Sequence, residues 1–63
     1  MDYRISEFVK WFEQFDDGIV KDSGDGVIIQ IETFDTYGKR YKLYRTKHED
    51  FQWFFEHDII KKE

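Results

Sequence analysis

The hydrophobic core of this chain must come from aromatic side chains, because the chain is short and has no cysteine. At 63 residues, folding buries only about 60 % of the surface that the unfolded chain exposes. Seven Phe, four Tyr and two Trp are available, and each ring buries roughly 150–250 Å² in a core. We therefore expect a single domain, residues 1–63, held by aromatic packing without disulfides or thiolate metal sites. An alternative is that some rings are buried only in an oligomer or a complex.

The N-terminal segment, residues 3–16, has the period of an amphipathic helix. Its apolar side chains are spaced at i, i+3, i+4, i+7 and i+10. They are Ile5, Phe8, Val9, Phe12 and Phe15. Asp2 suits the N-cap position and Gly18 the end of the helix.

A second helix is predicted over residues 47–61. Thr46 and Glu49 match a capping box at its start. One apolar stripe runs along it, formed by Phe51, Phe54, Phe55 and Ile59. Trp53 and Ile60 fall near the opposite side, and Trp11 lies off the stripe of the first helix. We interpret Trp11, Trp53 and Ile60 as a candidate apolar contact surface.

Three strands are predicted between the helices. A short strand over residues 19–22 is followed by a hairpin turn at 23–26, which contains two glycines. In the second strand, residues 27–34, the alternation turns Val27, Ile29 and Ile31 toward the core.

The third strand, residues 39–46, follows a turn at 35–38 and turns Tyr41 and Leu43 inward. Any register that keeps the inward faces together sets Glu32 beside Arg40 or Lys42. The predicted fold class is α+β, in the order α-β-β-β-α. It is a three-stranded antiparallel meander with both helices on one face.

Catalytic motifs are not evident in the sequence. His48 and His57 are nine residues apart on the predicted helix and face opposite ways, so they cannot share a metal. Residues 22–26 resemble the start of a calcium loop but lack the third acidic ligand and the closing Glu. We expect a non-enzyme without a cofactor or a metal.

Acidic and basic residues are sorted along the chain. Seven carboxylates and one lysine lie between residues 13 and 35, and five cations with no carboxylate between 39 and 47. The carboxylates are Glu13, Asp16, Asp17, Asp22, Asp25, Glu32 and Asp35. Net charge is −4, so the field favours a basic partner. We predict that these carboxylates form the partner-binding surface of a small acidic protein, which inhibits a host protein by occupying its basic nucleic-acid-binding groove. The other interpretation is a solvated acidic face.

The chain resembles small phage-type inhibitors, notably type II anti-CRISPR proteins. The resemblance lies in charge and in the order of predicted elements, over residues 17–24, 27–31 and 41–44. Those inhibitors mimic DNA electrostatically and block the site where a nuclease reads its target. The resemblance therefore implies an anti-defence function, although the cationic third strand differs from that pattern.

Two other functions are compatible with the sequence. One is a non-catalytic protein-interaction domain that homodimerises or docks through Trp53 and Ile60. The other is a nucleic-acid binder with the topology of double-stranded-RNA-binding domains, in which the cations of residues 39–45 alternate with tyrosines. The net charge of −4 opposes direct nucleic-acid binding.

A cytoplasmic location without membrane contact is expected. No apolar run approaches the ~20 residues of a membrane-spanning helix. The first residues lack the basic and apolar regions of a signal peptide.

Overall fold

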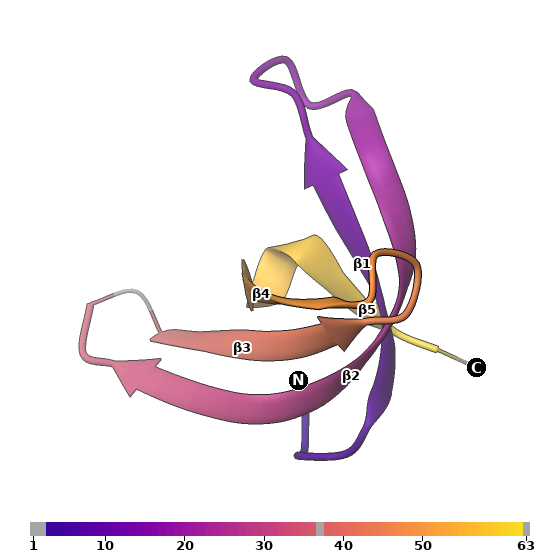
Figure 1. The fold of residues 1–63 in the computed structure, drawn as a ribbon. Helices are drawn as coiled ribbons and strands as arrows, with labels where there is room; N and C mark the ends of the chain where they lie inside the picture. Colours follow the sequence, from indigo (N-terminus) through magenta and orange to yellow (C-terminus); the bar gives the residue numbers. More distant parts are fainter. Residues whose placement is uncertain (1–2, 37, 63) are drawn as a thin grey trace.

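One antiparallel sheet of five strands makes up the fold, which a computed structural model describes for residues 3–36 and 38–62. The strands lie in the spatial order β4-β3-β2-β1-β5 (Figure 1). They are β1 (Phe8–Gln14), β2 (Val20–Phe34), β3 (Gly38–Arg45), β4 (Asp50–Phe55) and β5 (Ile59–Lys61). A 3-10 helix, η1 (Glu56–Asp58), joins β4 to β5. The α+β prediction is therefore wrong, and the fold is all-β.

The long strand β2 organises the sheet because both of its halves are paired. Residues 20–27 pair with β1, and residues 26–34 pair with β3. Figure 1 shows the β1–β2 and β2–β3 hairpins extending in different directions from the bend in β2. The turn predicted at residues 23–26 is wrong, since this segment continues the strand. Gly24 instead permits close packing, because a Cβ there would lie 2.8 Å from the Trp11 ring.

The predicted N-terminal helix is wrong, because residues 8–14 form β1. Val9 and Trp11 alternate into the core, whereas Phe8 is 62 % exposed. Apolar residues at positions 5, 8, 9, 12 and 15 fit a helical period, but Phe, Val and Trp are strong strand formers, and pairing with β2 decides the outcome. Asp2, the expected N-cap, lies outside the described residues.

The predicted C-terminal helix is also wrong. Residues 46–49 form the β3–β4 turn instead of a capping box, with Glu49 at a φ of 54° and its N–H donating to the Arg45 carbonyl. Beyond it, β4 is rich in aromatic residues and pairs with β3. Only Glu56–Asp58 is helical in this region. No helix in residues 3–36 and 38–62 is long and apolar enough to cross a membrane.

A bulge changes which residues of β2 face inward. The register shifts between Ile28 and Gln30, so Ile28 is fully buried and Ile29 is 38 % exposed. The inward orientation predicted for Val27 and Ile29 is therefore wrong. On β3, the prediction that Tyr41 and Leu43 are buried is confirmed.

The predicted neighbours of Glu32 are confirmed as well. Glu32 pairs with Arg40 in the β2–β3 register, and the Arg40 Nη2 lies 2.6 Å from the Glu32 Oε1. The predicted turn between the two strands includes Tyr37, which lies outside the described residues.

The core fills the inside of the bent sheet, and four of its members are aromatic. It consists of Tyr3, Val9, Trp11, Ile28, Tyr41, Leu43, Phe54 and Ile59. The buried polar ends of two rings are satisfied, because Trp11 Nε1 donates to the Asp25 carbonyl at 3.1 Å and the Tyr3 hydroxyl to the Ile59 carbonyl at 3.2 Å. Every strand therefore contributes to one aromatic core.

The bulge can be tested with two adjacent isoleucines. Ile28→Val should lower the free energy of unfolding by about 0.5–1.5 kcal/mol, because it removes a fully buried methylene. Ile29→Val is the matched control and should stay within about 0.5 kcal/mol of wild type. Urea denaturation measures both. A larger loss for Ile29→Val than for Ile28→Val would contradict the observed register.

Candidate functional site

Cationic and aromatic side chains alternate on the outer surface of β3 and β4, which we call the aromatic–cationic face. Its members are Arg40, Lys42 and Tyr44 of β3 and Phe51, Trp53 and Phe55 of β4. The register sets Lys42 opposite Trp53 and Tyr44 opposite Phe51. Successive strand residues point to opposite sides, so the core-facing side chains of the same strands leave these six outside.

Two β3 cations lie close to the rings of β4. The Arg40 Cζ lies 4.1 Å from the centroid of the Trp53 ring. The Lys42 Nζ lies 5.5 Å from the Phe51 centroid and 5.9 Å from that of Trp53. Cation–π attraction at these distances favours this arrangement. The Arg40 guanidinium is also held toward β2, because it contacts Glu32 and lies 5.3 Å from the Phe34 ring centroid.

Positive charge on this face is centred on Lys42. Arg40 is paired with Glu32, whereas Lys42 forms no ion pair with any described residue. The protein as a whole carries −4. The face is therefore a local exception to the negative field of the molecule.

An apolar row continues the face across the sheet to β1. In the strand registers, Phe8 lies opposite Val27, Val27 opposite Tyr44, and Tyr44 opposite Phe51. The two ends of the row are exposed, Phe8 by 62 % and Phe51 by 56 %. Val27 and Tyr44 between them are half-buried, so the row is a partly exposed apolar surface, and neighbouring apolar side chains mark binding sites more often than scattered single ones do.

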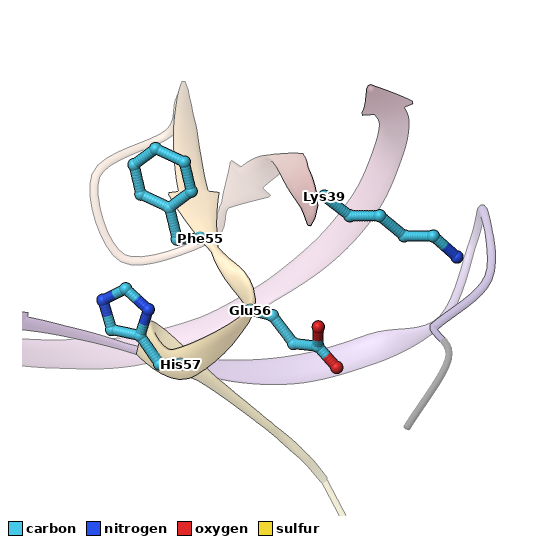
Figure 2. A pocket seen from close by; sticks show the side chains of 4 residues that line it. All are labelled: Lys39, Phe55, Glu56 and His57. Atoms are coloured by element: carbon cyan, nitrogen blue, oxygen red, sulfur yellow. The ribbon is translucent and has the colours of Figure 1, made fainter. Parts of the chain in front are cut away.

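A shallow hollow of about 520 Å³ adjoins the end of β4. Figure 2 shows its lining, in which the Phe55 and His57 rings lie to one side and Lys39 and Glu56 extend to the other. The two rings are parallel, with an angle of 4° between them and 6.0 Å between centroids. The hollow extends the aromatic surface beyond the last residue of β4.

A second hollow, of about 610 Å³, lies between the end of β1 and β4. Its lining is mostly polar. The residues are Phe12, Glu13, Gln14, Phe15, Gln52, Trp53, Phe54 and Asp58. Trp53 therefore belongs to both the aromatic–cationic face and this hollow.

Arg45 ties the strands around the second hollow together. Its side chain is buried and donates two hydrogen bonds to Asp50, at 2.7 and 2.6 Å, and one to Glu13 at 2.6 Å. Its Cζ lies 5.0 Å from the Trp11 ring centroid. The hydrogen bonds that Arg45 donates to Asp50 raise the pKa of Arg45, and the same bonds hold the pKa of Asp50 below its usual value.

Asp22 anchors the β3–β4 turn to β2. Its carboxylate contacts the Lys47 amine and lies 2.8 Å from the His48 Nε2. Hydrogen bonds from Lys47 and then His48 hold the pKa of Asp22 far below its usual range. Within residues 3–36 and 38–62, no group of three or more His, Cys, Asp or Glu side chains is placed to hold a metal ion.

The predicted acidic binding residues do not gather at one place. Four are paired within the chain: Glu13 with Arg45, Asp22 with Lys47, Asp25 with Lys62, and Glu32 with Arg40. Asp16 and Asp17 lie in the β1–β2 turn, and Asp35 follows β2. Only Asp16 and Asp17 form a pair of exposed carboxylates on the same turn.

The three predicted apolar contact residues are also separated. Trp11 is fully buried in the core. Ile60 is exposed on β5, opposite Lys10 of β1, whereas Trp53 lies on β4 at the other side of the sheet. Of the three, only Trp53 belongs to the aromatic–cationic face.

Sequence reasoning missed Phe51, Phe55 and Phe8 as surface residues. The signal was present in residues 50–55, where Phe51, Trp53 and Phe55 occupy every second position. Read as a strand, this pattern places the three rings on one side. No protein-family model, curated protein or solved structure matches this chain.

The Arg45–Asp50 contact predicts how stability depends on pH. A carboxyl group whose pKa is lowered on folding stabilises the folded state above its unfolded pKa, near 3.8, and this stabilisation is lost as pH falls toward the folded value. We therefore expect the free energy of unfolding to fall below about pH 4. Asp50→Asn should be less stable than wild type at pH 7 and should lose less stability on acidification.

The matched control is Asp16→Asn in the exposed β1–β2 turn, where Asp16 makes no ion pair with a described residue. It should retain the wild-type dependence on pH. Urea denaturation at several pH values between 2 and 7 measures the three proteins. Parallel curves for wild type and Asp50→Asn would show that the Arg45–Asp50 contact does not stabilise the fold.

Proposed function

We propose that this chain is a non-catalytic protein-binding domain whose partner docks on the aromatic–cationic face. The observation that carries the proposal is the register-aligned set of outward-facing rings and cations on β3 and β4, in which Phe51 and Phe55 are exposed and the other members half-buried. Aromatic residues and Arg are enriched in the buried centres of protein interfaces, where a few of them supply most of the binding free energy.

Inhibition of a nucleic-acid-binding protein through the acidic residues has less geometric support. Four of the seven carboxylates are paired with cations of the same chain. Each of these pairs has little net negative charge with which to attract a basic groove. The net charge of −4 still favours approach to a basic partner, and Asp16 and Asp17 are exposed. This function and the anti-CRISPR resemblance remain predictions.

Direct nucleic-acid binding is the weaker interpretation of the same face. Rings interleaved with cations suit single-stranded nucleic acid, whose bases stack on aromatic side chains. Affinity for nucleic acid, however, depends mainly on neutralising phosphates. Glu32 already neutralises Arg40, which leaves Lys42 as the cation of this face without an ion pair to a described residue. A protein partner fits these charges better.

The proposal is tested with immobilised protein and bacterial lysate. Lys42→Glu combined with Phe51→Ser should remove partners that wild type captures, because it changes the charge and the exposed ring at the centre of the face. Asp16→Lys with Asp17→Lys is the control and should capture them like wild type. Mass spectrometry identifies the proteins, and urea denaturation verifies that both variants are folded.

The opposite pattern would sink the proposal. Partners that are lost on charge reversal at residues 16 and 17, but retained by the Lys42 and Phe51 variant, would favour the acidic inhibitor. Capture of nucleic acid in place of protein, abolished by the Lys42 and Phe51 variant, would favour the nucleic-acid binder.

A further inference from the structure

We propose that β4 accepts an extended acidic segment of the partner protein as an added strand of the sheet. This inference rests on the proposed function and specifies how the partner binds. The added strand pairs with the backbone of β4, and its carboxylates lie over the aromatic–cationic face. Strand addition of this kind derives affinity from main-chain hydrogen bonds and specificity from alternate side chains.

The two edges of the sheet differ in how they are protected. Edge strands are usually kept short or charged, because their unpaired backbone groups invite another strand. The β5 edge follows this rule, with three residues including Lys61, and Lys62 comes next. The β4 edge has six residues in regular register with β3, and it contains no Lys, Arg or Pro. Among the described residues, β4 pairs with β3 alone.

Space for an added strand exists beside β4. The hollow of about 610 Å³ has Gln52, Trp53 and Phe54 of β4 in one wall and the end of β1 in the other. A neighbouring strand lies roughly 4.8 Å from β4, and the volume is within the ordinary range for binding sites. The hollow therefore lies where strand pairing requires the partner segment.

Charge decides which segment fits the outer side. Side chains on this side of an added strand lie next to Phe51 and Trp53. The Lys42 amine lies 5.5 Å from the Phe51 centroid and 5.9 Å from the Trp53 centroid, and it forms no ion pair with a described residue. Carboxylates at alternate positions of the added strand meet this positive charge.

The inner side requires different residues. Glu13, Gln14, Gln52 and Asp58 line the hollow, so neutral hydrogen-bond donors fit it and further carboxylates do not. The preferred segment therefore alternates Glu or Asp with Thr, Ser, Asn or Gln. A second copy of β4 is a poorer occupant, because its outer side chains are Phe51, Trp53 and Phe55 and supply no carboxylate to meet Lys42.

The probe is a capped octapeptide of alternating Glu and Thr, titrated into the whole protein. Two-dimensional NMR of the indole N–H groups supplies an internal control. The Trp53 signal should shift on binding, whereas the signal of Trp11, which is buried and bonded to Asp25, should not. Lys42→Glu should weaken binding about tenfold or more, because it reverses the charge that the carboxylates meet.

Backbone methylation tests pairing directly. In an added edge strand, the N–H groups of alternate residues face β4 and the others face solvent. One analogue is N-methylated at every Glu and the other at every Thr, which preserves all side chains. Strand addition predicts that one analogue loses binding and the other keeps it.

The remaining outcomes overturn strand addition. These are no binding of the octapeptide, equal behaviour of the two methylated analogues, or a Trp53 shift produced by oligothymidine and not by the peptide. A concentration-dependent dimer in sedimentation that is lost with Phe51→Ser would place a second copy at the edge instead. If lysate partners still depend on Lys42 and Phe51 in any of these cases, the proposed function stands and only the binding mode fails. If the Lys42 and Phe51 variant captures the same partners as wild type, the proposed function itself is wrong.

Discussion

The buried guanidinium of Arg45 connects strands that no backbone ladder joins. β1 and β4 are not neighbours in the sheet, yet Arg45 of β3 bonds Glu13 on β1 and Asp50 on β4 while packing against Trp11. A planar guanidinium can serve two carboxylates at once, which a lysine amine cannot do with the same geometry. These contacts link the β3–β4 hairpin to β1 beside the core.

The aromatic–cationic face follows from this closure and from the small size of the chain. The concave side of the sheet holds eight core residues, four of them aromatic. Strand alternation obliges β4 to place Phe51 and Trp53 outside when Phe54 points inside. Phe51 and Trp53 could not have been buried in the core, because the positions inside the sheet are already occupied. Arg40 and Lys42 lie close to these rings and cover them only in part.

The sequence predicted β3 well because local and long-range patterns agreed there. Tyr41 and Leu43 alternate with charged or polar residues, and Glu32 lies opposite the cation Arg40 on the neighbouring strand. Phe8, Val9 and Phe12 fit both a helix and a strand, so only pairing with β2 could decide between them. The bulge at Ile29 reverses the face of β2 without any local signal. Likewise, Gly24 resembles a turn residue, but its role depends on the distant Trp11 ring.

The sorting of charge along the chain has a different meaning in the folded protein. The acidic segment runs through β2 and the cationic segment forms β3, and these strands are antiparallel neighbours. Charges that are separated in sequence therefore meet as pairs, such as Glu32 with Arg40 and Asp22 with Lys47. Paired surface charges contribute little to long-range attraction. Lys42 differs from Arg40, since its neighbour on β2 is the neutral Gln30. Its charge is balanced by rings alone, and a carboxylate brought by a partner would complete the arrangement that the strands leave open.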